Sequence, residues 1–316
     1  MKGIILAGGS GKRLYPITKA ISKQLMPICD KPMIYYPLTT LMKAGIRDIL
    51  IITTGVDQSN FIRLLGTGEQ FGIKIEYAVQ EKPNGLAEAF IIGEDFIEDK
   101  PCAMALGDNI YFGDRFEKTL SDAKNYADAG LASIFGFKVK DPQRFGIMEI
   151  DDYGKVISVE EKPENPKSEY AITGLYFYPE GVSEYAKSVK PSNRNELEIT
   201  ALNDMYLQEG RLNGILLGSG FTWFDTGTYK SMHDAENLIC AVQENHDEII
   251  CSPEAEAFKR GWISKEKLLE QAEEMEKNDY GEYLLKLANT KPAKIYSLRN
   301  EEINLRWFFQ HLMLLL

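Results

Sequence analysis

Short aliphatic runs alternate with amphipathic stretches through the first 140 residues. Such runs are typical of strands buried on both faces of a parallel sheet, and apolar residues three or four positions apart are typical of helices. The predicted strands are Gly3–Ala7, Asp48–Thr54, Ile73–Val79, Cys102–Leu106 and Leu131–Val139. The predicted helices are Met33–Ala44, Ser59–Leu65, Gly85–Ile97 and Asp114–Ala127. This order predicts an α/β fold with a mostly parallel sheet flanked by helices, whose ligands bind at the carboxyl ends of the strands.

The pattern changes in the second half of the chain. Ile147–Ile150 and Val156–Glu160 predict a β-hairpin. Two strands (Ala171–Tyr178, Leu212–Leu217), two helices (Glu196–Glu209, Thr228–Glu244) and a polar break at Trp223–Gly227 follow, and residues 253–289 contain three helical patterns. We therefore expect a core over residues 1–240, a helical appendage over 241–290 that contacts another subunit, and a tail over 291–316.

The tail ends in the strongly apolar segment Leu305–Leu316. This segment is too short to cross a membrane. It fits a helix packed on another subunit, a membrane-surface segment, or a stretch without functional meaning, so its role stays open.

A glycine turn follows the first predicted strand. Gly8, Gly9 and Gly11 are followed at once by the cations Lys12 and Arg13. Glycine lets a ligand approach the backbone N–H groups closely, and fixed positive charge beside them suits a polyphosphate. The alternative is a tight turn with two solvated cations.

Neither of two common phosphate motifs fits this turn. The P-loop requires glycine where Leu6 stands, and the dinucleotide fingerprint requires its third glycine where Leu14 stands. Lys23 adds a further cation beyond the turn. The turn is therefore a candidate phosphate site of another class.

Three further polar stretches follow predicted strands. The loop from Gln80 to Gly85 offers amide groups that suit a base edge, and Lys162 ends the hairpin. Asp108 and Asp225 each follow an apolar stretch and suit Mg²⁺, which binds one or two carboxylates together with phosphate oxygens. Taken alone, each residue also fits an ordinary loop, cap or solvated strand end.

Together these features indicate phosphoryl or nucleotidyl transfer. That chemistry requires positive charge and a metal on the transferring phosphate and little covalent participation by the protein. A phosphate nucleophile is already ionised at neutral pH, so no general base is needed. The sequence indeed offers no Ser-His-Asp set and no other candidate histidine.

Composition limits the alternatives. A formal charge of −11 over 316 residues argues against a general nucleic-acid binder. No apolar run is long enough to span a membrane, and no signal peptide is recognisable, so we expect a cytoplasmic protein. The three histidines form no zinc pattern. The four cysteines show no C-x-x-C spacing, and we expect four free buried thiols: Cys29, Cys102, Cys240 and Cys251.

With these motifs the chain resembles the sugar-1-phosphate nucleotidyltransferases, in particular members that use thymidine triphosphate. The matching stretches lie in order over about residues 1–290: Leu6–Thr18, Lys23–Pro27, Asp30–Pro37, Gly85–Ala89, Gly107–Asn109, Arg144–Gly146, Glu160–Pro163, Ala171–Tyr178, Glu196–Thr200 and Trp223–Thr228. The resemblance implies a Rossmann-like nucleotidyltransferase core with a sugar-binding insertion and a C-terminal helical appendage.

The implied reaction is that of dTTP with α-D-glucose 1-phosphate, giving dTDP-glucose and pyrophosphate. It would proceed with Mg²⁺ by in-line attack of the sugar phosphate on the α-phosphorus. It would be the first step toward dTDP-L-rhamnose and related deoxysugars. The resemblance also implies a homotetramer with feedback by a downstream dTDP-sugar.

The resemblance also implies roles for individual residues. Arg13 and Lys162 would be catalytic, with Lys162 binding the attacking sugar phosphate. The nucleotide would bind to Gly8, Gly11, Lys12, Arg13, Lys23, Gln24, Gln80, Gly85 and Asp108. The sugar would bind to Asn109, Gly146, Glu161, Lys162, Ile172, Tyr176 and Arg194. Asp108 and Asp225 would hold Mg²⁺.

Two departures and three alternatives qualify this interpretation. Lys12 stands where the family commonly has threonine, and the tail after about residue 290 matches nothing in the family pattern. A same-fold enzyme that uses UTP, CTP or ATP, a non-catalytic regulatory relative and a nicotinamide-dependent dehydrogenase are the alternatives. Arg13, Lys162 and both aspartates are present, against the second, and Leu14 argues against the third.

Overall fold

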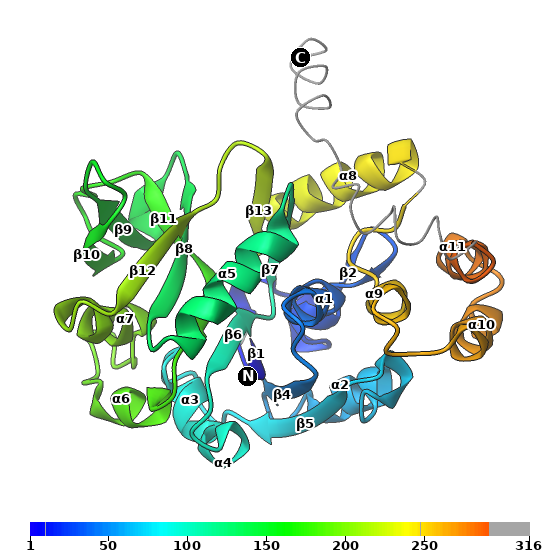
Figure 1. Ribbon diagram of the computed structural model, residues 1–316, viewed down its shortest axis with the longest axis horizontal. Coiled ribbons are helices and arrows are strands. Elements are labelled where there is room, and N and C mark those ends of the chain that lie inside the picture. Colours follow the sequence, from blue (N-terminus) through cyan, green and yellow to red (C-terminus); the bar gives the residue numbers. More distant parts are fainter. Residues whose placement is uncertain (10, 247, 291–316) are drawn as a thin grey trace, which may run out of the picture.

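The computed structural model describes residues 1–9, 11–246 and 248–290 of the chain. Within them, nine strands form one mixed sheet with the order β10-β9-β11-β6-β1-β4-β5, and β12 and β8 extend it beside β11 (Figure 1). Four strands run parallel, as predicted: β1 (Lys2–Ala7), β4 (Asp48–Thr53), β5 (Lys74–Val79) and β6 (Cys102–Leu106). The carboxyl ends of these four strands therefore lie at one edge of the sheet.

The sheet becomes mixed at β11. This strand (Tyr170–Tyr178) lies antiparallel to β6 on one side and to β8 (Ala132–Lys138) on the other. The hairpin of β9 (Gly146–Ile150) and β10 (Val156–Glu161) forms as predicted, and β12 (Leu212–Leu216) pairs with β8 in parallel. The strand–helix order had placed residues 131–139 as a further strand of the parallel series. A strand from later in the chain separates them from β6 instead.

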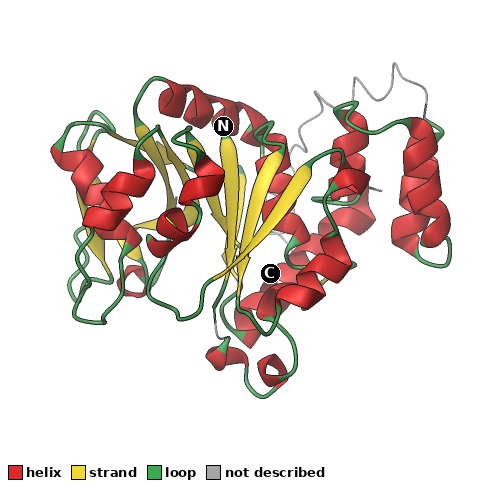
Figure 2. Ribbon diagram, turned by 90° about the horizontal axis from the view of Figure 1, so that it is seen from below, coloured by secondary structure: helices red, strands yellow, loops and turns green. Residues whose placement is uncertain are grey.

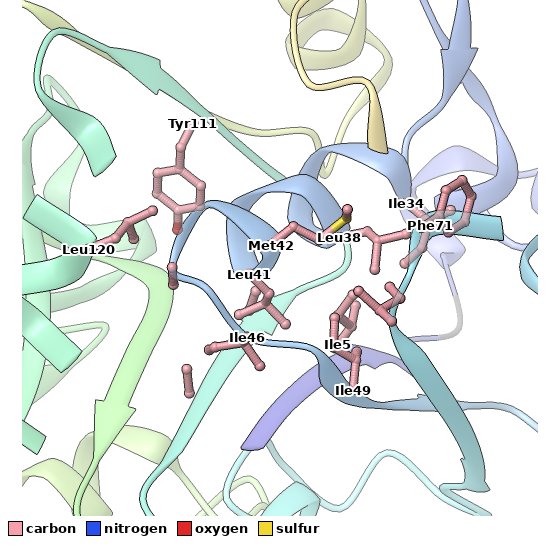
Figure 3. Close-up of a cluster of buried hydrophobic side chains, with 14 of the residues drawn as sticks. Ile5, Ile34, Leu38, Leu41, Met42, Ile46, Ile49, Phe71, Tyr111 and Leu120 are labelled. Atoms are coloured by element: carbon pink, nitrogen blue, oxygen red, sulfur yellow. The ribbon is translucent and has the colours of Figure 1, made fainter. Parts of the chain in front are cut away.

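Helices cover both faces of the sheet (Figure 2). One face carries α1 (Tyr35–Lys43), α2 (Gln58–Leu65) and α5 (Phe116–Asp128), and the other carries α3 (Glu88–Ile92), α4 (Glu94–Ile97), α6 (Val182–Ser188) and α7 (Ile199–Gln208). Neighbouring residues of β1 serve opposite faces, since Ile5 packs under the first set and Ile4 under the second. In Figure 3, Leu38 and Leu41 of α1 point toward Ile5 and Ile49. Each such buried side chain contributes about 1.5–3 kcal/mol.

Two antiparallel ribbons lie outside the large sheet. β7 (Asn109–Gly113) pairs with β13 (Phe221–Asp225), and β2 (Pro27–Ile28) pairs with β3 (Lys31–Pro32). The sequence predicts a polar break, and no strand, near residue 223. The first ribbon is short and pairs strands separated by more than a hundred residues, so local pattern did not reveal it.

The predicted helix over Gly85–Ile97 is interrupted and starts late. Its helical parts are α3 and α4, divided at Gly93. Gly85 has φ +113°, and the amide of Ala87 donates to Leu197 O at 3.1 Å instead of joining a helix. Residues 80–87 therefore remain a loop that is bonded to a distant segment.

The C-terminal helices pack on the core. α8 (Tyr229–His246) continues past residue 240, where the core was predicted to end. α9 (Pro253–Lys259) packs on α1. α10 (Lys265–Glu274) and α11 (Asp279–Ala288) follow at the edge beyond α2 (Figure 1). The three helices predicted over residues 253–289 are confirmed. The apolar segment Leu305–Leu316 lies outside the described residues.

The expectation of four free thiols is wrong for two of them. Cys29 and Cys240 form a disulfide with their Cα atoms 5.6 Å apart, and Cys102 and Cys251 are free and buried. The bonded cysteines are separated by 211 positions, so their spacing gave no sign of pairing. They meet because α8 packs beside the β2–β3 ribbon.

We expect Cys29→Ser to lower the free energy of unfolding by about 2–4 kcal/mol, because the crosslink restricts a long loop in the unfolded chain. Urea unfolding with and without dithiothreitol measures this. The reductant should destabilise the wild type and leave Cys29→Ser unchanged. Equal stability of oxidised wild type and variant would contradict the prediction.

Candidate active site

Two carboxylates meet where β6 ends. Asp108 follows β6, and its carbonyl oxygen accepts hydrogen bonds from the amide of Thr226 at 3.1 Å and from its hydroxyl at 2.7 Å. The β7–β13 register places Asp225 opposite Asn109. The ribbon that the sequence did not reveal therefore brings the two predicted metal ligands together.

Lys23 forms an ion pair with Asp108. The two side chains are 10% and 16% exposed, so water screens the pair weakly. Burial raises the pKa of Asp108, but the charge and hydrogen bond of Lys23 and a hydrogen bond from Asn109 outweigh burial and lower it. Asp108 is thus held ionised, and Lys23 anchors the segment after the glycine turn to the end of β6.

Asp225 lies in a less favourable environment. Burial and then repulsion from Asp108 raise the pKa of Asp225, although Lys23 and Arg13 oppose the shift. Among the described residues, none forms a hydrogen bond or ion pair with its carboxylate. A divalent cation between Asp225 and Asp108 would relieve this repulsion. The part of the chain that the structure describes holds no cluster of three or more His, Cys, Asp or Glu for a metal, so phosphate oxygens and water would complete the coordination.

The glycine turn lies beside this pair. Gly11 has φ +57°, and Thr18 Oγ1 donates to its carbonyl oxygen at 2.8 Å. Arg13 is exposed, and its guanidinium lies so close to Gly227 that a Cβ there would overlap Nη2. Lys12 is also exposed. The turn therefore brings the charge of Arg13 near Asp225 and leaves Lys12 exposed, and phosphate binding by these two cations stays a prediction.

Gln24 is buried behind the turn. Its side chain packs against Gly107, where an added Cβ would lie 2.9 Å from Gln24 Cγ, and its Oε1 accepts a hydrogen bond from Ser22 at 2.7 Å. Its backbone carbonyl accepts from the amide of Ile34 at 2.8 Å. What these contacts establish is a packing role beside Lys23. Direct nucleotide contact by Gln24 stays a prediction.

A second group of predicted residues gathers around Gln80. A Cβ on Gly8 would lie 2.8 Å from Gln80 Oε1, so the glycine lets these two segments approach. A Cβ on Gly85 would overlap the backbone of Leu197, and Leu197 N donates to Asn84 O at 2.6 Å. The candidate base-binding loop is thus braced by the segment that carries Arg194.

The third group surrounds Glu161. Its carboxylate accepts hydrogen bonds from Arg194 Nη2 at 2.9 Å and Thr200 Oγ1 at 2.5 Å, and Lys162 Nζ lies 3.3 Å from it. Gly146 leaves room here, since a Cβ would lie within 3.7 Å of Glu161, Thr200 and Ile172. Burial and the charge of Glu161 raise the pKa of Tyr176, which keeps its hydroxyl protonated. Five predicted sugar-site residues therefore meet here: Gly146, Glu161, Lys162, Ile172 and Arg194.

Asn109 connects Asp108 to β13 and β11 through its side chain. Its Oδ1 accepts from Trp223 Nε1 at 2.6 Å and from the amide of Gly174 at 3.2 Å, and its Nδ2 donates to Asp108 at 3.0 Å. Asn109 therefore positions Asp108, and a direct contact with sugar stays a prediction.

Several residues that shape these groups were not predicted as site residues. Thr226 donates a hydrogen bond to Asp108, and Gly227 lies against Arg13. Thr200 donates to Glu161, and Glu88 accepts from Gln80. Glycine and threonine beside the predicted residues in motifs such as Trp223–Thr228 were the available signal, but residue type alone did not indicate their contacts.

Comparison with known proteins places this site in a family. Residues 2–242 match the family model described as nucleotidyl transferase. A glucose-1-phosphate thymidylyltransferase of Neisseria meningitidis is 54% identical over 287 residues, which cover 91% of this chain and 99% of the relative. The chain belongs to the nucleotidyl transferase family.

Two further relatives agree. An enzyme of the same name from Mycobacterium tuberculosis is 48% identical, again over 91% of this chain and 99% of the relative. A crystal structure from Bacillus anthracis, described as a glucose-1-phosphate thymidylyltransferase in complex with a sucrose, superimposes with a TM-score of 0.70 at 42% identity. It covers 75% of this chain and 94% of that one. The predicted α/β nucleotidyltransferase fold is confirmed, and among the described residues no helix is long and apolar enough to span a membrane.

We expect Gly227→Ala to impair nucleotidyl transfer without unfolding the protein. The new Cβ would displace the flexible end of Arg13, so stability should change by less than about 1 kcal/mol. Loss of a charge aimed at the transferring phosphate should lower kcat by about a hundredfold. Steady-state rates and thermal unfolding measure both effects.

Gly218→Ala is the matched control for this variant, because a Cβ at Gly218 meets no atom within 4 Å. Its rate should remain near that of the wild type. An unimpaired Gly227→Ala enzyme would show that the position of Arg13 over Gly227 does not matter.

Asp225 gives a pH-dependent prediction. Since its pKa is raised in the folded protein, the stability it contributes is complete below its unfolded pKa of about 4 and is lost as the pH rises through the folded pKa. Asp225→Asn is neutral throughout. In the presence of EDTA the variant should therefore be more stable than the wild type at neutral pH, and this advantage should vanish near the unfolded pKa.

Thermal unfolding with EDTA and with MgCl₂ measures this. Mg²⁺ should stabilise the wild type and have a smaller effect on Asp225→Asn, because an amide is a weaker ligand than a carboxylate. A metal-free variant that is less stable than the wild type at neutral pH would refute the prediction.

Proposed function

We propose that this chain transfers a thymidylyl group from dTTP to α-D-glucose 1-phosphate, releasing pyrophosphate and dTDP-glucose. The observation that carries the proposal is the position of Arg13 above Gly227, beside the Asp108–Asp225 pair. A cation and two carboxylates lie beside the glycine turn, and this arrangement supports the binding of a triphosphate there. The names of the relatives support the thymidine nucleotide and the glucose phosphate as substrates.

In the proposed binding mode each group has one task. Gly8, Gly11 and Lys12 cradle the triphosphate, and Arg13 stabilises the charge that develops on the α-phosphate and on the leaving pyrophosphate. Lys23 fixes Asp108 and adds positive charge. Gln80 and Gly85 contact the base. Asp108 and Asp225 are the residues that would hold Mg²⁺, which when bound neutralises phosphate charge and orients the α-phosphate.

The sugar phosphate enters from the side of Glu161. Glu161 and Arg194 would bind the glucose hydroxyls, and Lys162, which is 45% exposed and lies 3.3 Å from Glu161, would pair with the sugar phosphate. The phosphate oxygen then attacks the α-phosphorus in line with the departing pyrophosphate. No general base is required because the nucleophile is already ionised. We further propose that the protein is a cytoplasmic homotetramer subject to feedback by a dTDP-sugar.

A second candidate substrate is UTP. The free polar atom of Gln80 is an acceptor, and uracil offers the same N3–H donor as thymine. The two bases differ in this respect from cytosine, whose N3 is an acceptor.

The test is pyrophosphate release with glucose 1-phosphate and MgCl₂, measured with dTTP, UTP, CTP, dCTP and ATP in turn. Release should be fastest with dTTP. Lys162→Ala should lower turnover by at least about a hundredfold, because charge on the attacking phosphate is no longer compensated. Its dTTP affinity should stay within about threefold of the wild-type value, as calorimetry would show.

Lys167→Ala is the matched control, since Lys167 is an exposed lysine in the same loop. Near-normal turnover by Lys162→Ala would refute the role of that lysine. Absence of release by the wild type with every nucleotide would refute the proposed function itself and favour a non-catalytic relative.

A further inference from the structure

Gln80 has both of its amide hydrogens engaged by acceptors of the protein. Its Nε2 donates to Glu88 Oε2 at 2.7 Å and to Gly85 O at 3.2 Å. An amide nitrogen carries two hydrogens, so its donor capacity is used. Its Oε1 receives no hydrogen bond from any described residue. The acceptor is therefore the free end of this side chain.

These two partners also fix the orientation of the amide. A backbone carbonyl and an ionised carboxylate can only accept hydrogen bonds. A flipped amide would place Gln80 Oε1 against both acceptors and lose both bonds. The oxygen therefore faces the glycine turn, where an added Cβ on Gly8 would lie 2.8 Å from it.

Glu88 is itself held in place. Asn84 Nδ2 donates to Glu88 Oε1 at 2.7 Å, so each carboxylate oxygen has one amide partner. Asn84 is fixed in turn through its backbone carbonyl oxygen, which accepts a hydrogen bond from the backbone amide of Leu197 at 2.6 Å. The carboxylate thus forms a rigid bridge between two amides at the start of α3.

We propose that Glu88 is a positioning residue for base selection: by holding the Gln80 amide with its oxygen toward the nucleotide, it favours bases with an N–H at this edge. Thymine and uracil present N3–H, and cytosine presents a bare N3. Repulsion between two acceptors would therefore exclude cytosine. This inference rests on the proposed function, in which Gln80 contacts the base.

Glu88→Gln tests the inference. Glutamine keeps the shape but can donate as well as accept, so Gln80 can turn its Nε2 toward the base. We expect kcat/KM for dTTP to fall about three- to tenfold and that for dCTP to rise, which lowers the dTTP/dCTP ratio by at least about tenfold. The dTTP/UTP ratio and the KM for glucose 1-phosphate should remain unchanged, because they do not depend on the amide orientation.

Glu94→Gln is the matched control. It removes the same charge from the neighbouring helix α4, where Glu94 pairs with Lys187 at the surface. Its dTTP/dCTP ratio should equal that of the wild type. A general loss of stability in Glu88→Gln would lower both rates together and leave the ratio intact, so the ratio separates selection from folding.

The remaining outcomes are decisive. A wild-type enzyme that uses dCTP within about threefold of dTTP overturns the inference even if Glu88→Gln does not fold. An active wild type with an unchanged ratio in Glu88→Gln also overturns it, while the proposed function stands. A wild type inactive with every nucleotide refutes the proposed function first, and the inference with it.

Discussion

The ion pair between Lys23 and Asp108 is the interaction on which the site depends. Both charges are largely removed from water, so neither can be lost without leaving the other buried and unpaired, which typically costs about 3–5 kcal/mol. The pair ties the segment after the glycine turn to the end of the central strand β6. The backbone of Asp108 in turn holds Thr226, and Arg13 lies over Gly227. Three segments distant in sequence are thereby fixed around one point.

The Lys23–Asp108 ion pair also makes the carboxylates of Asp108 and Asp225 differ in their environment. Asp108 has its counter-charge within the protein and is held ionised. Asp225 has no such partner among the described residues, and its ionisation is opposed by burial and by Asp108. An additional positive charge beside Asp225 would therefore be favourable, and this is the place where the proposed reaction brings a metal and a phosphate. Lys23 therefore balances the charge of Asp108 within the protein, whereas the metal of the proposed reaction would balance the charge of Asp225.

Backbone contacts couple the proposed base and sugar regions. Leu197 bonds to Asn84 and Ala87 on the base side, and its own segment leads to Glu198, which binds Arg194. Glycine at position 85 is required because any side chain would strike Leu197. A displacement of the base region would therefore also displace the sugar region. This coupling helps to keep the fixed geometry that in-line attack requires.

The sequence alone determined the parallel strands of the core and indicated the class of chemistry. Aliphatic periodicity located the parallel strands, and the glycine turn with its cations, the Gln80 loop and the two aspartates indicated phosphoryl or nucleotidyl transfer, because these signals are local. The family resemblance added the nucleotide and the sugar phosphate. The tertiary structure decided which of them meet. The insertion of β11 beside β6, the β7–β13 ribbon that joins Asp225 to Asp108, the Cys29–Cys240 disulfide and the orientation that Glu88 imposes on Gln80 all depend on hydrogen-bond register or side-chain direction. Such contacts join residues through space, and spacing along one chain carries no record of them.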